Sequence, residues 1–503
     1  MRALISVYDK TGIVEFAKEL VELGWEIIST GGTYKTLEDA GINVLDVEEV
    51  TGFPDMLDGR VKTLHPNVHG GILYRRDNLS HQETIDTHGI KGIDMIVNTL
   101  YPFEETVKNS EATHSEIIEK IDIGGPSMIR AACKNYQDVI IVTEPKDYDW
   151  ILTELKADEV SLETRQQLAG KAFGLTAYYD AQIAAYFNQL NGVDFPEYLT
   201  KGYRFGEELR YGENPHQKAA LYVESDPTYE FKQLHGKQIS YNNMNDLKAC
   251  IELVKEFEVP AAVAVKHANP CGVAIGDTIA EAYQKAYECD PESIFGGIIG
   301  LNRPVDKETA EKLSQIFLEI IAAPSFDEDA LEILTKKKNI RLLEMDNLME
   351  AERAPMMIRE TVNGALVQNV DLELYKGDVE LKTTREVSEQ EKIDLDFAWK
   401  VVKHIASNAM VVAKDGMTYG LGHGEVKRVW ALEKALERSE FDLNGAVVAS
   451  DAFFFKDTID TLAEYGIKAI IQPGGSVKDP EVIETANEKD ISVLFTGMRH
   501  FKH

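Results

Sequence analysis

Short apolar runs alternate with longer amphipathic ones over the N-terminal part of the chain. Strand-like runs cover residues 3–7, 26–29, 44–47, 93–99 and 139–142, and helical patterns cover residues 14–23, 34–40 and 127–135. This rhythm is typical of βα units around a parallel sheet. A long helical pattern over Leu162–Leu190 then ends in the turn-rich stretch 191–196, which is typical of a linker. We therefore expect a first α/β domain over residues 1–192.

The second part of the chain, residues 201–503, contains an internal repeat. The stretch from Val265 to Gly297 matches the stretch from Ala413 to Gly445 at a constant offset of 148 residues. In each copy a strand enters a glycine-containing turn, a helical stretch follows, and a second apolar strand starts at the aligned glycine. This favours a duplicated α/β unit, over about residues 201–370 and 393–503, joined through the charged stretch 372–392. A chance match is the alternative, because glycine-rich turns are common in α/β proteins.

Composition narrows the class of protein. The 503 residues include 53 Lys and Arg against 85 Asp and Glu, a net charge of −32, which would repel a nucleic-acid backbone or an anionic membrane. No apolar run reaches the roughly 18 residues of a membrane span, and the first residues lack the features of a signal peptide. The four cysteines contain no C-x-x-C pair, which argues against a disulfide framework and a zinc site. We therefore expect a cytoplasmic protein that binds small molecules and no metal.

Two stretches of the first domain could bind a phosphate. Thr-Gly-Gly-Thr at residues 30–33 lies between a strand and a helical pattern, where backbone N–H groups can face an anion. A plain tight turn is the alternative. The loop 58–66 adds Arg60, Lys62 and Thr63, and Arg can hold a phosphate through two N–H groups while Lys can donate a proton. A solvated basic loop is the alternative there.

Two further residues of this domain are candidates for proton transfer. Tyr101 follows a strand that ends at Asn98-Thr99, which puts it at the carboxyl edge of a parallel sheet, where ligands bind. Asp122 precedes a Gly-Gly-Pro stretch and a helix. It could be a helix N-cap or a catalytic acid, and local sequence leaves both open.

In the second part, two turns carry candidate chemistry. Residues 210–217 are rich in directional donors, which suits a substrate-binding loop. Lys266 and His267 end a strand and enter a Gly-Pro-rich turn, where a base and a proton donor would be adjacent; an isolated Lys-His pair would more often be structural. Pro270-Cys271 resembles half of a zinc-deaminase signature, but position 274 is Ala and no His-x-Glu occurs, which disfavours that chemistry.

Together these stretches resemble the bifunctional purine biosynthesis proteins that combine phosphoribosylaminoimidazole-carboxamide (AICAR) formyltransferase and IMP cyclohydrolase. The resemblance runs, in the family's order, through residues 6–12, 31–33, 59–66, 100–103, 122–125, 130–135, 210–217, 266–267, 407–408, 450–454 and 499–503. It implies formyl transfer from 10-formyltetrahydrofolate to AICAR, giving FAICAR, and then dehydrative closure of FAICAR to IMP. It also implies a methylglyoxal-synthase-like first domain, two cytidine-deaminase-like units without zinc, and a homodimer with transformylase sites at the subunit interface.

The resemblance also implies roles for individual residues. For cyclisation it implies proton transfer by Lys62, Tyr101, Asp122 and Lys134, and nucleotide binding by Lys10, Thr30, Gly31, Gly32, Thr33, Arg60, Thr63, Asn98, Thr99, Ile123 and Gly124. For formyl transfer it implies His267 as the base, supported by Lys266 and oriented by Asn408. In that half it implies substrate binding by Arg210, Tyr211, Asn243, Gly296, Glu319, Arg428, Val429, Phe453 and Arg499.

Some stretches depart from the family pattern, and the chain leaves two alternative functions open. Tyr8, Asn98-Thr99, the turn 422–428 and the stretch 453–456 differ from the family, and the last two alter the folate side of the site. One alternative is that the second half is a degenerate nucleotide- or folate-binding module beside an active cyclohydrolase. The other makes the first domain a methylglyoxal-synthase-like lyase, which the combination of Lys62, Tyr101 and Lys134 disfavours.

Overall fold

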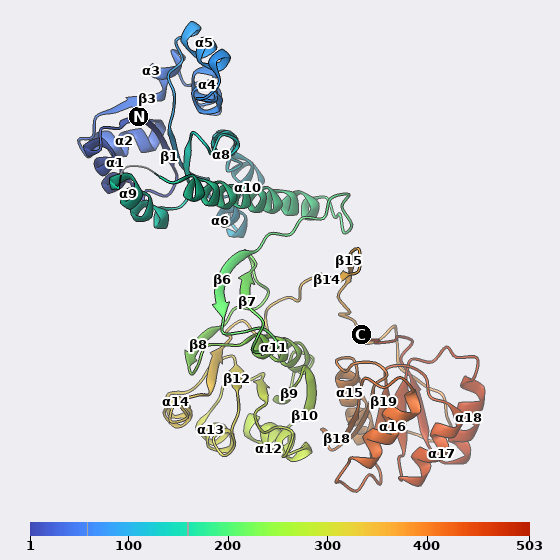
Figure 1. Ribbon diagram of the computed structural model, residues 1–503. Coiled ribbons are helices and arrows are strands. Elements are labelled where there is room, and N and C mark those ends of the chain that lie inside the picture. The colour runs from blue at the N-terminus through green and yellow to red at the C-terminus, as the bar shows by residue number, and fades with distance from the viewer. Residues whose placement is uncertain (58, 158–159) are drawn as a thin grey trace. The chain divides into compact units, whose positions relative to one another are not determined.

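The computed structural model describes residues 1–57, 59–157 and 160–503, which form two compact units (Figure 1). Unit 1 comprises Met1–Arg204 and Val223–Asp226, and unit 2 comprises Phe205–Tyr222 and Pro227–His503. The predicted linker at residues 191–196 lies inside unit 1. Asp58, the first residue of the predicted basic loop, lies outside the described residues. Within the described ranges, no helix is both long and apolar enough to cross a membrane.

Unit 1 is built on a five-stranded sheet in the order β3-β2-β1-β4-β5. The strands are β1 (Arg2–Val7), β2 (Glu26–Ser29), β3 (Val44–Asp46), β4 (Met95–Thr99) and β5 (Ile140–Val142). Each neighbouring pair runs parallel, as the alternating pattern predicts. Because β1 and β4 are neighbours, the loops that follow them meet at the carboxyl edge of the sheet, where parallel sheets bind ligands.

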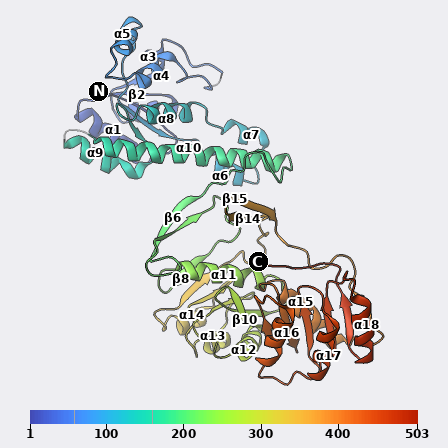
Figure 2. The same ribbon diagram turned by 45° about the vertical axis from the view of Figure 1, so that its right-hand side comes forward.

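The four predicted helical patterns of unit 1 correspond to α1, α2, α8 and α10, and the other helices were not predicted. They are α1 (Ile13–Glu22), α2 (Gly31–Asp39), α3 (Val47–Thr51), α4 (Pro66–Leu73), α5 (Leu79–Thr87), α6 (Phe103–Lys108), α7 (His114–Glu119), α8 (Gly124–Lys134), the 3-10 turn η1 (Pro145–Asp147), α9 (Tyr148–Lys156) and α10 (Leu162–Leu190). Both α2 and α8 begin three residues before the predicted helical pattern, so their glycines form the first helical turn. The long α10 runs along unit 1 (Figure 2) and contacts α8 and β5.

Unit 2 contains a 12-stranded sheet in the order β16-β21-β20-β19-β17-β18-β10-β9-β11-β12-β13-β8. Its strands are β8 (Lys232–His235), β9 (Ala261–Lys266), β10 (Asn269–Ile275), β11 (Ile298–Leu301), β12 (Ile320–Ala323), β13 (Arg341–Glu344), β16 (Glu380–Leu381), β17 (Met410–Lys414), β18 (Met417–Gly422), β19 (Val447–Ser450), β20 (Ala469–Gln472) and β21 (Ser492–Phe495). Two hairpins lie outside it: β6 (Arg204–Leu209) with β7 (Ala219–Val223), and β14 (Met356–Thr361) with β15 (Gly364–Asn369).

The large sheet consists of two copies of one topology. Read outward from the β10·β18 pairing in the middle, the first copy runs β10-β9-β11-β12-β13-β8 and the second β18-β17-β19-β20-β21-β16. The helices match as well, since α11 (Tyr241–Val254) and α15 (Glu389–Val402) have the same length and start 148 residues apart. The other helices are α12 (Ile279–Cys289), α13 (Lys307–Leu313), α14 (Glu328–Leu334), α16 (Arg428–Glu437), α17 (Lys456–Glu464) and α18 (Asp479–Glu488). This excludes a chance match of glycine turns, while the likeness of each copy to a cytidine deaminase stays a prediction.

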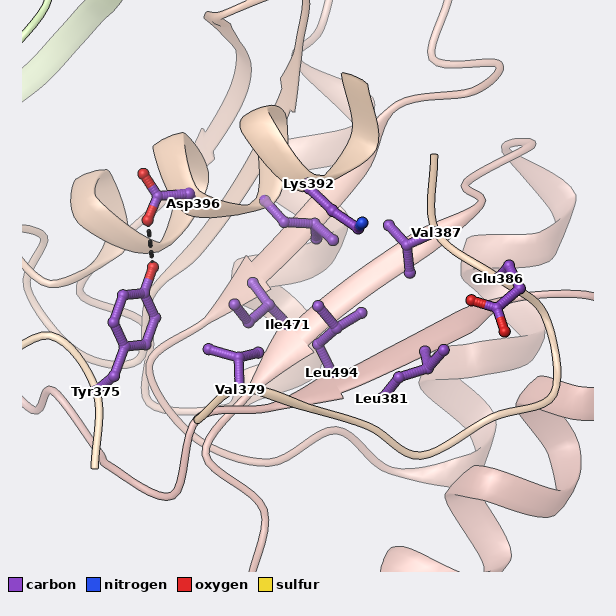
Figure 3. Close-up of a pocket in the computed structure, with 10 residues that line it drawn as sticks. Tyr375, Val379, Leu381, Glu386, Val387, Lys392, Asp396, Ile471 and Leu494 are labelled. Carbon is purple, nitrogen blue, oxygen red and sulfur yellow. Dashed lines mark hydrogen bonds between the residues drawn. The ribbon is translucent and has the colours of Figure 1, made fainter. Parts of the chain in front are cut away.

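The stretch 372–392, predicted as a joining segment, belongs to the second copy. It contributes the edge strand β16, which pairs with β21, and the start of α15. Between this stretch and the sheet lies a cavity of about 430 Å³ (Figure 3), lined by side chains that include Val379, Leu381 and Leu494. At one end of the cavity the Tyr375 hydroxyl donates a hydrogen bond to Asp396. Its lining includes none of the predicted site residues.

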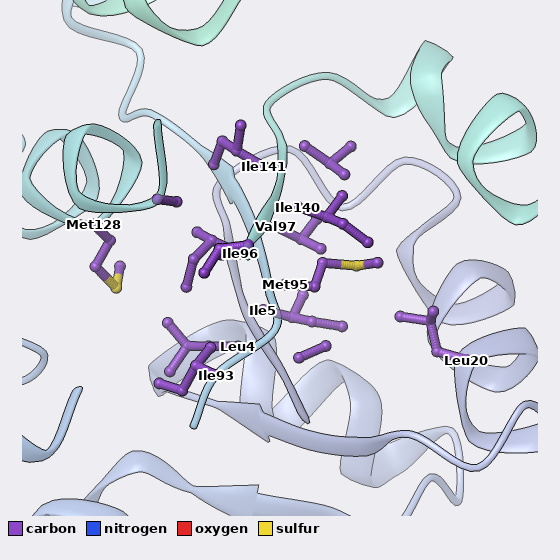
Figure 4. Close-up of a cluster of buried hydrophobic side chains, with 14 of the residues drawn as sticks. Leu4, Ile5, Leu20, Ile93, Met95, Ile96, Val97, Met128, Ile140 and Ile141 are labelled. Atoms are coloured by element: carbon purple, nitrogen blue, oxygen red, sulfur yellow. The ribbon is translucent and has the colours of Figure 1, made fainter. Parts of the chain in front are cut away.

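The core of unit 1 holds the site-bearing strands in place. Leu4 and Ile5 on β1 are fully buried, and Figure 4 shows them among the apolar side chains of β4 and β5. Leu20 of α1 and Met128 of α8 belong to the same core, and each is at most 1% exposed. Each such side chain contributes roughly 1.5–3 kcal/mol on burial, so the ends of β1 and β4 start from a rigid base.

Candidate functional sites

Lys10 lies beside the first turn of α2. Its Nζ donates to Thr33 Oγ1 at 3.1 Å and to the carbonyl of Val7, and the Thr33 hydroxyl donates to the same carbonyl at 2.9 Å. Burial lowers the pKa of Lys10, although the charge of Asp9 opposes this. A helix N-terminus has free backbone N–H groups and a partial positive charge. With Lys10 beside it, the turn of Thr30, Gly31, Gly32 and Thr33 has the composition of a phosphate site.

The basic loop converges on the same place through Lys62 and Thr63. A Cβ on Gly31 would lie 3.5 Å from Lys62 Nζ, and a Cβ on Gly124 would lie 2.9 Å from Thr63 Oγ1. The loop therefore connects the starts of α2 and α8. Lys62 Nζ also forms a salt bridge with Asp55 Oδ2 at 2.5 Å, a partner that the sequence did not suggest.

Arg60, in contrast, is directed away from this cluster. It forms a salt bridge with Glu119, and more than half of each side chain is exposed. Exposed pairs of this kind contribute about 1 kcal/mol or less, so the guanidinium can be released at little cost. Phosphate binding by Arg60 remains a prediction.

Asp122 lies directly before Ile123, the N-cap of α8, and bonds to the first turn of that helix, while a catalytic role for it stays a prediction. Its Oδ1 accepts a hydrogen bond from Gly125 N–H at 2.8 Å, within the first turn of α8, and the nearby backbone N–H of Tyr101 also favours the charged form of the carboxylate. Burial raises the pKa of Asp122, and these N–H donors only partly oppose it. Burial and the nearby Asp122 charge likewise raise the pKa of Tyr101. Both groups hold their protons more firmly than in water, as proton donors in a site often do.

Tyr179 fixes the loop that carries Asp122, and sequence reasoning missed it. Its hydroxyl donates to the carbonyl of Lys120 at 2.8 Å and accepts from the backbone N–H of Asp122 at 2.9 Å. Burial raises the pKa of Tyr179 to about 12, so it is a neutral hydrogen-bonding group. It lies on α10, 57 residues beyond Asp122, and only the repeating apolar pattern of that helix could have indicated that it faces inward.

The end of β4 offers an acceptor to a ligand. Asn98 donates through Nδ2 to the carbonyl of Ser6 at 2.8 Å, but its Oδ1 has no hydrogen-bond partner among the described residues. The residue is only 2% exposed, and an unpaired buried acceptor costs about 1–3 kcal/mol. Its neighbour Thr99 instead accepts through Oγ1 from Tyr8 N–H at 2.7 Å and so shapes the loop after β1.

Two predicted residues of α8 lie at its opposite ends. Ile123 is the N-cap and is 58% exposed, so its side chain is open to a ligand. Lys134 lies in the last turn, about 15 Å along the axis from Gly124 at 1.5 Å per residue. The structure does not bring Lys134 beside Asp122, and its part in proton transfer stays a prediction.

In unit 2 the strand pairings gather the formyl-transfer candidates at one edge of the sheet. β9 ends at Lys266, while β11 starts opposite Val265 and β12 starts beside β11. Gly296 and Glu319 therefore share the edge of Lys266. In the second copy, antiparallel pairing across β10, β18 and β17 brings the start of β17 and the end of β19 to the same edge. Asn408 precedes β17 and Phe453 follows β19, which places both at that edge.

Lys266 and His267 lie at the tip of the β9–β10 hairpin. Lys266 Nζ donates to the carbonyl of Phe295 at 2.9 Å, next to Gly296. His267 and Ala268 form the two-residue turn, with φ angles of 55° and 57°, and the His267 side chain is exposed. The pair is thus directed into the space above the edge rather than into the core.

Asn408 and Arg428 are in direct contact. Arg428 donates to Asn408 Oδ1 at 2.7 Å and to Asp451 Oδ1 at 2.5 Å, while Asn408 Nδ2 donates to the carbonyl of Glu425 at 2.6 Å. Asp451 is fully buried, so it fixes the guanidinium. It lies within the quoted stretch 450–454, but its pairing with a residue of another element could not be predicted.

The remaining predicted binding residues fall into four groups. Among the residues predicted to line the folate pocket, the Arg499 guanidinium lies 4.8 Å from the Phe453 ring centroid, and Val429 follows Arg428 in the first turn of α16. Glu319 is paired with the buried Arg341 at 2.5 Å, which sequence reasoning missed.

Arg210 and Tyr211 stack on each other, with the guanidinium 5.5 Å from the ring centroid. Asn243 is 7% exposed, and its Oδ1 accepts from Ser240 N–H at 3.1 Å in the capping box of α11. The side-chain carbonyl of Asn243 therefore already accepts a hydrogen bond within the protein. No group of three or more His, Cys, Asp or Glu side chains in the described part of the chain is arranged to hold a metal ion.

Comparison with known proteins covers both units. Residues 12–127 match the family described as an MGS-like domain, and residues 132–438 match the family described as AICARFT/IMPCHase bienzyme. Relatives named bifunctional purine biosynthesis protein PurH from Oceanobacillus iheyensis, Caldicellulosiruptor saccharolyticus and Clostridium botulinum are 54%, 52% and 54% identical, each over 100% of this chain and 99% of the relative. A solved structure titled Crystal structure of ForH is 39% identical over 37% of this chain and 98% of its own, with a TM-score of 0.34.

Proposed function

The chain belongs to the PurH family of bifunctional purine biosynthesis proteins, and we propose that each of its two units carries one of the two activities. The protein transfers a formyl group from 10-formyltetrahydrofolate to AICAR and closes the resulting FAICAR to IMP. Unit 1, which contains the MGS-like match, is assigned the cyclisation, and unit 2 is assigned the formyl transfer.

For cyclisation, a carboxamide nitrogen must attack the formyl carbon, and water must then leave. This needs proton transfer and stabilisation of an oxyanion rather than a covalent enzyme intermediate. The assignment rests on Asp122 at the start of α8 and on the nearby Tyr101, since burial raises the pKa of both side chains. Lys62 lies beside the start of α2, and the adjacent Thr63 lies beside the start of α8, so a ligand with its phosphate at α2 can reach Lys62. The unpaired Asn98 Oδ1 would accept a hydrogen bond from that ligand.

For formyl transfer, the AICAR amine is a weak nucleophile and needs a base as well as a stabilised tetrahedral intermediate. His267 is the proposed base. Lys266 and the Asn408–Arg428 pair lie at the same sheet edge, which supports their roles beside it. These contacts speak against a degenerate second half, because a site that had lost its function would not need a buried Asp451 to hold Arg428.

A homodimer with shared formyl-transfer sites is part of the proposal. β9 and β17 are separated by two strands in the sheet, and at about 4.8 Å per spacing their ends lie roughly 14 Å apart. One substrate would hardly touch both His267 and Asn408 of the same chain. A site completed by a second copy would bring the two sets closer, and such symmetric pairs are the commonest oligomers.

A cytoplasmic location is also proposed. All four cysteines are free, and Cys133 and Cys250 are buried. Free thiols are typical of a reducing compartment. Fractionation of cells that express the protein, followed by immunoblotting, tests this, and recovery outside the cytoplasmic fraction would contradict it.

The activity test supplies AICAR and 10-formyltetrahydrofolate to the purified full chain and follows tetrahydrofolate and IMP separately. Both products are expected. Tetrahydrofolate without IMP would contradict only the role of unit 1, and the absence of tetrahydrofolate would contradict the role of unit 2. The division between the units is tested by His267→Ala, which should abolish formyl transfer and leave cyclisation of supplied FAICAR intact. Loss of both activities would contradict the division.

A further inference from the structure

Asp246 anchors the turn that carries His267, and we propose that it is a positioning residue for formyl transfer. It lies on α11, and its Oδ1 accepts a hydrogen bond from Ala268 N–H at 2.6 Å. Ala268 directly follows His267 in the turn between β9 and β10. The inference rests on the proposed role of His267 as the base, and it adds a residue that acts through His267 without touching the substrate.

The turn needs an anchor because its residues do not adopt it freely. His267 and Ala268 both have φ in the left-handed region. Two-residue hairpin turns of this kind favour Asn or Asp followed by Gly. Neither position holds a glycine, so the backbone is strained at both. The bond to Asp246 offsets this strain, together with a bond from Asn269 Nδ2 to the His267 carbonyl at 2.9 Å.

The second copy of the repeat contains the same arrangement with less backbone strain. Its turn between β17 and β18 consists of Asp415 and Gly416, with φ angles of 54° and 71°, which is the favoured pair for such a turn. Asp394, 148 residues after Asp246, lies at the same position of the equivalent helix α15. It accepts from Gly416 N–H at 2.8 Å and from Asp415 N–H at 3.1 Å.

Comparison of the copies indicates what Asp246 does. In the second copy, Gly416 adopts the left-handed backbone without strain, and no predicted site residue lies in the turn. In the first copy, Ala268 replaces that glycine and His267 replaces the aspartate. Without the carboxylate, the strained turn would relax and displace the imidazole, and a displacement of about 1 Å is enough to slow a reaction substantially. We therefore expect the carboxylate of Asp246, and not that of Asp394, to affect the rate of formyl transfer.

The test compares two substitutions of Asp246 in the full chain. Asp246→Ala removes the acceptor, whereas Asp246→Asn keeps an oxygen at the same place. We expect the Ala variant to lose roughly tenfold or more in kcat for formyl transfer, with KM for AICAR changed by less than about threefold, and the Asn variant to keep most of kcat. Adding Ala268→Gly to Asp246→Ala should restore part of the lost kcat, because glycine needs no anchor in this turn. Cyclisation of supplied FAICAR should not change.

Asp394→Ala is the matched control, since it removes the equivalent contact in the second copy. It should lower thermal stability and leave kcat within about twofold when assayed well below the melting temperature. Equal losses of kcat in Asp246→Ala and Asp394→Ala would overturn the proposal, as would an unchanged Asp246→Ala or an equal loss in Asp246→Asn.

Two further variants keep the result decisive. If Asp246→Ala does not fold, its combination with Ala268→Gly decides, because near-normal kcat supports the anchoring role and a tenfold loss contradicts it. His267→Ala separates this inference from the proposed function. If formyl transfer survives His267→Ala, His267 is not the base and the proposed function of this residue is contradicted. If His267→Ala is inactive while Asp246→Ala is fully active, only the positioning role of Asp246 is contradicted.

Discussion

Gly32 offers a test of phosphate binding that does not disturb the fold. It lies in the first turn of α2, and a Cβ added there would meet nothing within 4 Å. Gly32→Ala should therefore leave the melting temperature nearly unchanged. If a phosphate approaches the backbone of this turn, the added methyl group should raise KM for FAICAR by about tenfold, since close approach of backbone to anion is what glycine permits.

The control for Gly32 is its neighbour Gly31. It has a φ of 54°, and an added Cβ would lie 3.5 Å from Lys62 Nζ, so Gly31→Ala should lower stability as well as nucleotide binding. KM is measured with FAICAR as the only substrate, and stability by thermal unfolding. An unchanged KM for Gly32→Ala at normal stability would mean that the phosphate lies elsewhere.

The substitution Asp122→Asn should raise the stability of the fold and lower the cyclisation activity. Burial raises the pKa of Asp122 above the ordinary 3.8, so the folded state binds this proton more tightly than the unfolded chain. The contribution of Asp122 to stability is therefore greatest below the unfolded pKa and falls as the pH rises through the higher folded pKa. Asp122→Asn removes that loss, so its melting temperature should rise relative to the wild type as the pH is raised above the ordinary pKa of 3.8.

The same substitution removes a proton donor, and cyclisation should fall by about a hundredfold or more. Formyl transfer serves as the internal control and should be unaffected. A variant that loses stability relative to wild type at higher pH would show that the hydrogen bonds of the carboxylate outweigh its burial.

At the scale of elements, a buried ion cluster joins the equivalent helices of the two repeats. Glu256 follows α11, and Lys403 and His404 follow α15. Glu256 Oε1 lies 2.7 Å from His404 Nε2, 2.8 Å from Arg353 and 3.3 Å from Lys403. Burial opposes ionisation of Glu256, but these partners outweigh it and lower its pKa to about 2. Burial also lowers the pKa of His404 to about 4, so His404 is neutral at neutral pH.

Removing the charge of Glu256 should leave Lys403 buried without a counterion, while Arg353 keeps its salt bridge with Glu252 at 3.3 Å. Glu256→Gln should therefore destabilise unit 2 by about 3–5 kcal/mol at neutral pH. A carboxylate with a lowered pKa stabilises the fold above its unfolded pKa of 4.5 and loses this effect as the pH falls towards 2. The difference from wild type should then shrink over that range in urea unfolding.

Glu389→Gln is the matched control, because its pair with Lys392 is exposed and should contribute little to stability. If both variants lose the same stability, the buried cluster is not a connection between the repeats.

The accuracy of the sequence predictions depended on the range of the interactions that set each element. The bounds of α10 were predicted correctly because its apolar period and the Ser161 cap are local signals. The start of α2 was placed too late because Gly31 and Gly32 are poor helix formers, and their conformation is set by Lys10 and Thr33 packing against β1. Local sequence could not show that.

For the sites, residues that touch a ligand could be proposed from short motifs, but the residues that hold them could not. Tyr179, Asp451 and Arg341 contact their partners over 22 to 59 residues of chain, and no local pattern marks them. Asp246 is an exception in principle, because the offset of 148 residues pairs it with Asp394. A search of both copies for shared polar positions would have found it.

At the scale of the whole molecule, the arrangement of the formyl-transfer residues can be tested by mixing variants. If each site takes His267 from one chain and Asn408 from the other, a heterodimer of His267→Ala and Asn408→Ala has one doubly defective site and one intact site. Random exchange of subunits makes about half of the dimers heterodimers, so the mixture should recover about a quarter of the wild-type activity. Each variant alone should be nearly inactive.

The two chains must be unfolded and refolded together so that they exchange, and the same variants refolded separately and then combined serve as the control. Recovery that appears only after joint refolding requires two chains at one site, because a site within a single chain would carry one defect in every molecule. A mixture that stays inactive, although sedimentation shows heterodimers, would place His267 and Asn408 in the site of the same chain. The sheet would then have to bend enough to bring the ends of β9 and β17 closer than the roughly 14 Å of three strand spacings.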